Sequence, residues 1–172
     1  MITWQKISLL GLVTLSSFCG LSSIANAQDV SRLAATNPNS PYSEAVGVPS
    51  GYIMYFLAGA TPAPANPNAP RGSAERMGDT TTQTISALTR LGETLKSLGL
   101  GYGDVVKATV YIVGDPAMNG DIDFAGMNKA WFQFFGTPQQ PNKPTRSTVK
   151  VGLVTPGQLI EIETVAVKKT AR

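Results

Sequence analysis

The segment 144–167 constrains the fold most, because two runs with strand character are separated there by turn-forming residues. Apolar residues alternate over 149–153, and the run 159–167 is rich in β-branched residues. Between the runs, Pro156 restricts φ and Gly157 accepts a positive φ, as tight turns require. The pattern predicts a β-hairpin in which the two runs pair antiparallel.

Two charged residues in this segment are candidates for a site that acts on a small molecule. Arg146 stands at the entry to the first run, and Glu161 lies within the apolar second run. In a regular hairpin the two would be offset by about six positions, or roughly 20 Å. Within one chain they would hardly contact the same small molecule. Either the strands pair in another way, or a second subunit completes the site.

The N-terminus has the features of a secretory signal peptide, residues 1–27. Lys6 precedes an apolar run over 7–24, which is followed by the sequence Ala-Asn-Ala. The hydroxyl residues that interrupt this run argue against a permanent membrane anchor. We therefore expect cleavage after Ala27 and a periplasmic or secreted mature protein without a stable membrane anchor.

The rest of the chain is expected to form one domain. Residues 28–40 are polar and lack periodicity, which predicts a flexible tether, and residues 41–172 suffice for a single domain with its own core. The chain has no histidine, and its one cysteine, Cys19, lies within the expected signal peptide. Disulfides, zinc sites and cysteine or histidine catalysis are therefore excluded from the mature chain. The net charge of +3 is scattered, so no nucleic acid partner is expected.

Three further strands are expected upstream of the hairpin. The runs 45–48 and 52–58 are β-prone and are separated by Pro49-Ser50-Gly51, which predicts a second hairpin. The run 104–113 is the clearest strand, since apolar residues alternate along it. The order of strand 52–58, helix and strand 104–113 favours a parallel pair of these two strands.

Two amphipathic helices are expected between the strands. The first is capped by Asp79 or Thr80 and ends before Gly99, and the second covers 123–135. Its buried stripe is expected to contain Phe124, Met127, Trp131, Phe134 and Phe135. Asn128 lies on the border of this stripe, where an amide needs partners. It is either a capping or core amide or a ligand contact.

Two polar segments have less certain roles. Residues 60–79 contain four prolines, which predicts a long surface loop that is either a binding loop or a family-specific insertion. The segment 114–123 contains oxygen-bearing residues whose spacing matches no calcium loop. We expect no metal there, and these residues are interpreted as helix caps and solvated turn residues. They are Asp115, Asn119, Asp121 and Asp123.

The pattern as a whole predicts an α+β fold with two helices on one face of a mixed sheet. No third helix is available for the other face. The economical cover for that face is another subunit, which agrees with the offset expected between Arg146 and Glu161.

Five short segments together resemble the Rid family of enamine/imine deaminases (the YjgF/YER057c/UK114 group). The resemblance extends from residue 41 to residue 167 and includes five motifs in the family's order. They are PYSEAV at 41–46, DVVKATV at 104–110, Met127-Asn128 before Trp131 and Phe134-Phe135, PTRS at 144–147, and IEIE at 160–163.

The resemblance implies a chorismate-mutase-like (YjgF-like) fold with a six-stranded mixed sheet, and a homotrimer with clefts between subunits. It implies that Arg146 binds the substrate carboxylate and that Glu161 positions the hydrolytic water, with no cofactor and no metal. It also places further residues in the cleft, namely Tyr42, Asn128, Thr148, Ala58 and Gly59. The chain departs from the family pattern at Ala58 and Ala60, where Ser-Gly-Gln is typical, and at Thr148 and Glu44, where Cys and Gln are frequent.

The expected activity is hydrolysis of 2-imino or enamine acids to 2-keto acids and ammonium, with Arg146 and Glu161 as the catalytic pair. The alternative is a non-catalytic binder of small carboxylates or a chaperone-like trimeric protein. Expected export favours this alternative, because enamines arise mainly from cytoplasmic pyridoxal-phosphate enzymes. A ribonuclease ranks third, since export and scattered charge argue against RNA.

Overall fold

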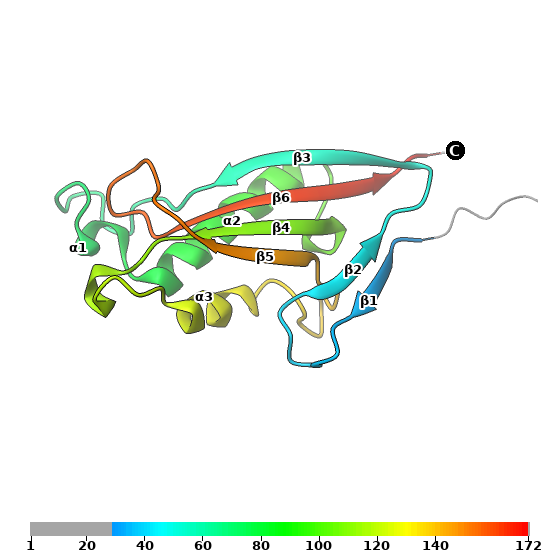
Figure 1. Ribbon diagram of the computed structural model, residues 1–172. Helices are drawn as coiled ribbons and strands as arrows, with labels where there is room; N and C mark the ends of the chain where they lie inside the picture. Colours follow the sequence, from blue (N-terminus) through cyan, green and yellow to red (C-terminus); the bar gives the residue numbers. More distant parts are fainter. Residues whose placement is uncertain (1–28, 172) are drawn as a thin grey trace, which may run out of the picture.

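The main sheet has four strands in the order β3-β6-β4-β5 in the computed structural model, which describes residues 29–171 (Figure 1). The expected signal peptide lies outside the described residues. β6 (Ile160–Lys169) runs antiparallel to both neighbours, β3 (Tyr52–Ala60) and β4 (Val105–Ile112). β5 (Thr145–Lys150) pairs in parallel with β4 and forms one edge of the sheet.

Two further strands, β1 (Ser31–Ala34) and β2 (Ser43–Gly47), form a separate antiparallel sheet beside β5. The helices α2 (Thr80–Ser97) and α3 (Phe124–Trp131) lie on one face of the main sheet, and the short α1 (Ala74–Met77) precedes them (Figure 1). The predicted α+β class with two helices on one face is therefore confirmed. The resemblance implied one sheet of six strands, whereas the six observed strands form separate sheets of four and two.

The hairpin expected over 144–167 is wrong, because β4 lies between β5 and β6. Residues 151–159 instead form a connection that passes the end of β4. Turn-forming residues at 155–158 specify a local turn, but they do not decide which strands pair. β4 carries a row of fully buried apolar side chains, and pairing on both of its edges satisfies its backbone in the interior.

The hairpin expected over 45–58 is also wrong, since β2 pairs with β1 and β3 pairs with β6. The strands β3 and β4 run in the same direction, because both are antiparallel to β6, but they are not adjacent. The parallel pair is instead β4 with β5, and α3 lies in the crossover between them. Strand order depends on long-range packing, which local periodicity does not report.

The tether expected over 28–40 contains β1 and is not structureless. Arg32 on β1 donates hydrogen bonds from one nitrogen to the carbonyls of Gly103 and Val105, at 2.9 and 3.0 Å. The strand is held by pairing with β2 and by this side chain rather than by an apolar face, which explains why its sequence shows no periodicity.

Both helices begin close to where their sequence signals predict, and α2 also ends there. Asp79 caps α2 by accepting a hydrogen bond from the amide of Thr82 at 2.7 Å, and Gly99 follows the helix with a φ of 67°. Asp123 caps α3 by accepting from the amide of Gly126 at 2.8 Å. α3 is shorter than expected, and Phe124 at its start is 45% exposed rather than buried.

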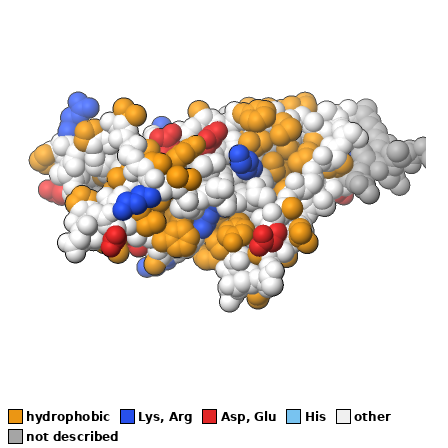
Figure 2. Space-filling model, viewed as in Figure 1, with side chains coloured by type: hydrophobic (Ala, Val, Ile, Leu, Met, Phe, Trp, Pro, Cys, Tyr) orange, Lys and Arg blue, Asp and Glu red, His pale blue; other side chains and the backbone are white. Residues whose placement is uncertain are grey.

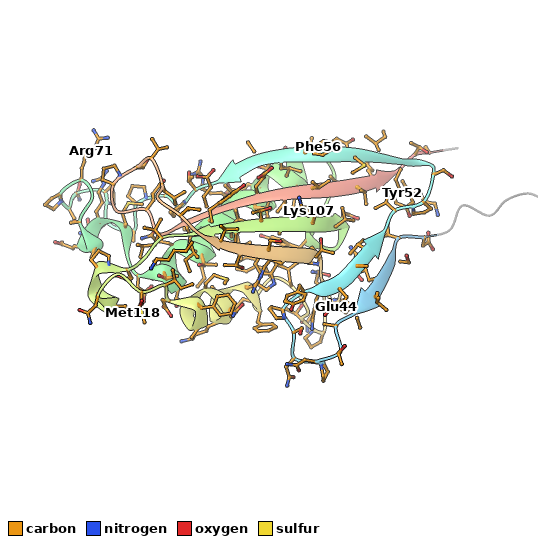
Figure 3. The ribbon with its side chains drawn as sticks, in the orientation of Figure 1. Glu44, Tyr52, Phe56, Arg71, Lys107 and Met118 are labelled. Carbon is orange, nitrogen blue, oxygen red and sulfur yellow. The ribbon has the colours of Figure 1, made fainter. Side chains whose placement is uncertain are left out.

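The face of the main sheet opposite the helices is open and partly apolar, as Figure 2 shows. Phe56 on β3 is 78% exposed on this face, beside Met54. Lys107 on β4 is also exposed and is labelled with Phe56 in Figure 3. No helix among the described residues is long and apolar enough to cross a bilayer.

Candidate functional site

Arg146 lies on β5 with its side chain directed toward α3. One terminal nitrogen of its guanidinium donates to Oδ1 of Asn128 at 2.8 Å, and the other contacts Sδ of Met127 at 3.6 Å. The half-buried amide of Asn128 therefore has the cation as its partner. Both contacts come from α3, so packing of this helix on the sheet positions the guanidinium.

Two aromatic rings complete the surroundings of this cation. Cζ of Arg146 is 4.8 Å from the ring centre of Trp131 and 5.8 Å from that of Phe124. Trp131 is fixed in place, because it stacks on Phe135 with ring centres 4.4 Å apart and its indole N–H donates to the carbonyl of Pro41 at 2.9 Å. Aromatic faces stabilise a cation without neutralising it, which leaves guanidinium N–H groups able to bind an anion.

No carboxylate in the described part of the chain forms an ion pair with Arg146. Burial lowers the pKa of Arg146 to about 10, and the nearby Tyr42 partly opposes this shift. The side chain is still protonated at neutral pH. A half-buried cation that lacks an anionic partner, and that presents N–H donors in one plane, is suited to a small carboxylate.

Thr148 and Tyr42 lie near the same cation. Thr148 is two residues beyond Arg146 on β5, so the two side chains share the face that α3 covers. Tyr42 directly follows Pro41, whose carbonyl is held by Trp131, and this contact brings the phenol within electrostatic range of Arg146. We call Arg146, Asn128, Thr148 and Tyr42 the arginine cluster.

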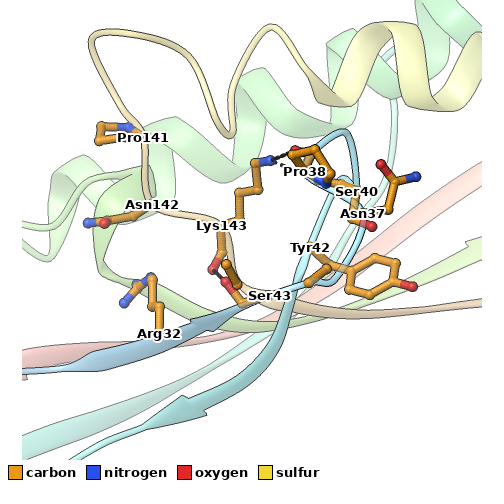
Figure 4. A pocket seen from close by; sticks show the side chains of 11 residues that line it. Arg32, Asn37, Pro38, Ser40, Tyr42, Ser43, Pro141, Asn142 and Lys143 are labelled. Atoms are coloured by element: carbon orange, nitrogen blue, oxygen red, sulfur yellow. Dashed lines mark hydrogen bonds between the residues drawn. The ribbon is translucent and has the colours of Figure 1, made fainter.

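A cavity of about 260 Å³ lies beside Tyr42, beneath the loop between β1 and β2 (Figure 4). Arg32 and Lys143 contribute positive charge to its lining, and among the described residues no Asp or Glu lines it. Lys143 donates to the carbonyls of Ser40 and Pro38 at 2.8 and 3.4 Å, and Arg32 is bonded to carbonyls as described above. Both cations thus tie the segment before β2 to the rest of the domain.

Glu161 lies on β6 and directs its carboxylate to the open face of the sheet. Its register partner on β4 is Tyr111, which also points away from the helices. A hollow of about 560 Å³ surrounds the carboxylate, and Ala58, Gly59 and the segment 151–153 line it. We call Glu161, Ala58 and Gly59 the glutamate cluster.

The conformation of β3 allows the carboxylate of Glu161 to lie across this strand. The register between β3 and β6 shifts between Leu57 and Ala60, as in a β-bulge, and Gly59 lies at the shift. A Cβ atom at residue 59 would overlap Oε1 of Glu161. Glycine leaves this space to the carboxylate, because any side chain at residue 59 would displace it.

A second acid and a phenol share the hollow with Glu161. The hydroxyl of Tyr111 donates to Oε2 of Glu163 at 2.9 Å, and this bond raises the pKa of Tyr111. Glu163 is thereby engaged, whereas no hydrogen bond to the carboxylate of Glu161 is found among the described residues. Glu161 is thus the carboxylate available to a water molecule or a ligand.

The two clusters lie on opposite faces of the sheet. Along β4, Arg146 is opposite Ala108 and Glu161 is opposite Tyr111. An offset of three residues along the strands and two strand spacings across them corresponds to about 14 Å. The structure therefore brings the predicted residues together in two groups within one chain, but it does not bring Arg146 to Glu161.

The sequence interpretation missed the aromatic surroundings of Arg146. Phe124 and Trp131 were assigned to the core, although their spacing of seven residues, with Asn128 between them, places all three on one side of α3. This spacing could have indicated that the two rings surround the cation, but it is equally typical of a buried apolar stripe. The bond of Tyr111 with Glu163 was also missed, because it joins residues 52 positions apart and no local pattern reports it.

Comparison with known proteins gives consistent matches over most of the chain. The sequence model of the family described as Endoribonuclease L-PSP matches residues 32–168. The 2-iminobutanoate/2-iminopropanoate deaminase of Bos taurus is 34% identical over 129 residues, which are 74% of this chain and 80% of that protein.

Two solved structures are similar in fold. Escherichia coli TdcF with bound serine is 32% identical, and the match covers 76% of this chain and 90% of that one with a TM-score of 0.53. Yersinia pestis YyfB, of the Rid protein family, covers 81% of this chain and 98% of its own with a TM-score of 0.60, at 23% identity. The second likeness concerns the fold alone.

Proposed function

Since this chain belongs to the Endoribonuclease L-PSP family, we propose that it hydrolyses 2-imino acids, or the enamines in equilibrium with them, to 2-keto acids and ammonium. Relatives at about this level of similarity include the bovine 2-iminobutanoate/2-iminopropanoate deaminase. The observation that carries the proposal is the half-buried guanidinium of Arg146, which is supported by rings and an amide and has no carboxylate partner in the described chain.

The substrate class follows from the geometry of this cation. A guanidinium binds a carboxylate through two parallel N–H bonds in one plane, and a lysine cannot reproduce this arrangement. Such binding fixes the carbon next to the carboxylate, which in a 2-imino acid is the C=N carbon. Phe124, which is 45% exposed, leaves an apolar surface next to the cation for the substrate's side chain.

The reaction needs one water molecule and a group that moves a proton. Starting from the protonated imine, the water oxygen forms a bond to the C=N carbon while the π electrons become the lone pair of the nitrogen. The carboxylate of Glu161 accepts a proton from the attacking water and returns it to this nitrogen. The C–N bond then breaks as the hydroxyl oxygen forms the carbonyl, and the released ammonia takes up the hydroxyl proton, which gives ammonium and the 2-keto acid. Proton transfer of this kind typically contributes a factor of about 10² to 10⁴.

The two clusters belong, in this proposal, to one active site made by two subunits. Within one chain they lie on opposite faces of the sheet, as described above. A second chain that covers the open face would bring its own arginine cluster to the hollow around Glu161, and a closed ring of three chains repeats this contact. The exposed apolar residues of that face, Phe56 among them, support such cover.

The second candidate is a non-catalytic binder of small carboxylates. Ala58 is its supporting observation, because a methyl group lines the hollow at a position where a hydroxyl could have bonded to the substrate or water. Such a protein would retain the function of Arg146 and lose that of Glu161.

The two candidates differ in ammonium release. An amino-acid oxidase generates the imine in situ, semicarbazide traps what remains, and binding of a 2-keto acid is titrated by calorimetry in parallel. We expect wild type to accelerate loss of imine, Arg146→Ala to lose both activity and binding, and Glu161→Gln to lose turnover while it still binds. Wild type that binds the keto acid and leaves the imine untouched would establish the binder.

A further inference from the structure

We propose that Gln83 is a positioning residue for Glu161, and that it acts through the turn at 155–158 and the start of β6. This inference rests on the proposed function, because it assigns Glu161 the catalytic role described above. Gln83 itself lies on α2, on the helix side of the sheet, and it does not contact the hollow that Glu161 lines.

All hydrogen-bonding groups of the Gln83 side chain are engaged, apart from one lone pair. The residue is fully buried, with 0% exposure. Its Nε2 donates to the carbonyls of Gly78 and Gly157, both at 3.0 Å, and its Oε1 accepts from the amide of Leu159 at 2.7 Å. A buried amide with three bonds to backbone fixes the segments that it joins, since each broken bond leaves a buried polar group unsatisfied.

The bond to Leu159 lies two residues before Glu161. On its other side, the carbonyl of Leu159 accepts from the amide of Val113 at 2.9 Å, just beyond the end of β4. The backbone at the entry to β6 is thus clamped between α2 and β4. The direction in which the strand then runs sets the position of the Glu161 carboxylate over Gly59.

The turn at 155–158 also rests on the proline-rich segment. Gly72 and Gly157 approach so closely that a Cβ atom on Gly157 would lie 2.8 Å from the carbonyl oxygen of Gly72, and one on Gly72 would lie 3.1 Å from Cβ of Pro156. Both glycines have positive φ, 78° and 81°. The loop at 60–79, for which the sequence allowed either a binding role or a simple insertion, therefore supports the turn.

The same connection forms one wall of the hollow. Residues 151–153 line it, and residues 155–158 are held by Gln83 and Gly72. A displacement of about 1 Å between a catalytic group and the substrate lowers rates by up to about a hundredfold. Gln83 is therefore expected to affect turnover without affecting the carboxylate anchor, because none of its three bonds reaches Arg146 or the residues of α3 that hold it.

Gln83→Met tests this inference, because methionine has nearly the same length and makes none of the three bonds. We expect kcat for imine hydrolysis to fall about ten- to a hundredfold, while KM and keto-acid affinity stay within about twofold. Thr84→Val is the matched control. It removes a buried hydrogen bond of the neighbouring residue, from Thr84 Oγ1 to the carbonyl of Thr80, which lies within α2.

A second variant guards against a failure of Gln83→Met to fold. Gly72→Ala disturbs the turn from the surface side, and we expect the same loss of kcat with unchanged KM. Equal losses of kcat in Thr84→Val and Gln83→Met would overturn the inference, because they would indicate general destabilisation. A rise in KM at constant kcat would also overturn it, because that would indicate loss of the carboxylate anchor.

A readout independent of activity separates this inference from the proposed function. Carbodiimide coupling of glycine ethyl ester, followed by peptide mass spectrometry, measures the reactivity of Glu161 relative to Glu163 as a function of pH. We expect a change of at least about threefold in this ratio in Gln83→Met and none in Thr84→Val. If wild type hydrolyses no imine but the ratio changes, the deaminase proposal fails and the positioning role stands. An unchanged ratio with unchanged kcat refutes the positioning role.

Discussion

Arg146 is held by the rings of Phe124 and Trp131 and by the amide of Asn128, so its charge is stabilised without being cancelled. At the scale of single residues this arrangement favours binding over stability. A buried cation without an acid destabilises the folded state, and an anionic ligand removes that penalty.

The Arg146→Met variant should therefore unfold at a higher temperature than wild type. Burial lowers the pKa of Arg146 in the folded state to about 10, which is below its ordinary value. Because the folded state holds this proton less tightly than the unfolded chain, the charge opposes folding at every pH below about 10. We expect Tm at pH 7 to rise by about 2 °C by calorimetry, with loss of keto-acid binding. A fall of several degrees would show that the ring contacts outweigh the cost of burial.

Gly59→Ala should reduce turnover with little effect on stability. A methyl group there would overlap the Glu161 carboxylate, whose flexible side chain can move aside, so catalysis should suffer more than packing. We expect kcat to fall at least about tenfold and keto-acid affinity to stay constant. Gly101→Ala is the matched control, because a Cβ there meets nothing within 4 Å. Wild-type turnover in Gly59→Ala would remove Glu161 from the site.

At the scale of elements, the helices are the part of the fold that the sequence determined best. Asp79 and Asp123 cap α2 and α3 where local signals predicted, because a cap depends on neighbours within a few residues. Strand order was mispredicted at both expected hairpins, because it depends on which apolar rows pack together. The bulge at Gly59 and the bonds of Gln83 join residues far apart in the chain, and no local pattern reports them.

The sequence identified the residues of the candidate site but did not predict how they are arranged in space. The resemblance to the Rid family, which the family match and the bovine relative confirm, identified the residues of both clusters. Residue spacing correctly predicted that Arg146 and Glu161 lie apart within one chain. That prediction assumed that their two strands pair with each other, which they do not. In both the expected hairpin and the observed sheet, one chain cannot bring these two side chains together.

Replacing the α2 cap should cost stability in a pH-dependent way. We expect Asp79→Ala to lower the free energy of unfolding by about 1 kcal/mol at pH 7 in urea titrations, and Asp79→Asn to retain most of it. The hydrogen bond from Thr82 lowers the pKa of Asp79 below 3.8. The negative charge therefore adds to the stabilisation by the cap above the ordinary pKa, and this added part is lost as pH falls through the lower pKa of the folded state. The difference between wild type and Asp79→Ala should narrow below about pH 4, and a constant difference would contradict the role of the charge.

At the scale of the whole molecule, the proposed assembly depends on the open face of the sheet. Phe56 is its most exposed large apolar residue, and it lies on β3 far from Met118 (Figure 3). The proposed trimer buries this face, whereas the helix side of the sheet is already covered within the chain.

Phe56→Glu should dissociate the proposed trimer, because a charge would be buried between subunits. Light scattering at micromolar concentration should give a trimer mass for wild type and a monomer mass for the variant. Met118→Glu, which changes an apolar residue that is 43% exposed away from the open face, should remain a trimer. A wild-type monomer would refute the assembly and with it the shared site.

The division of the site between two faces of one sheet has a genetic consequence. If each site takes its arginine from one chain and its glutamate from the next, two different inactive variants can form active sites when they assemble together. Coexpression of Arg146→Ala with Glu161→Gln in equal amounts should restore about one site in four, because random assembly pairs an intact arginine with an intact glutamate at that frequency. A single chain that carries both substitutions should restore nothing. The protein would then show intragenic complementation, because a functional site needs residues from two copies of the chain.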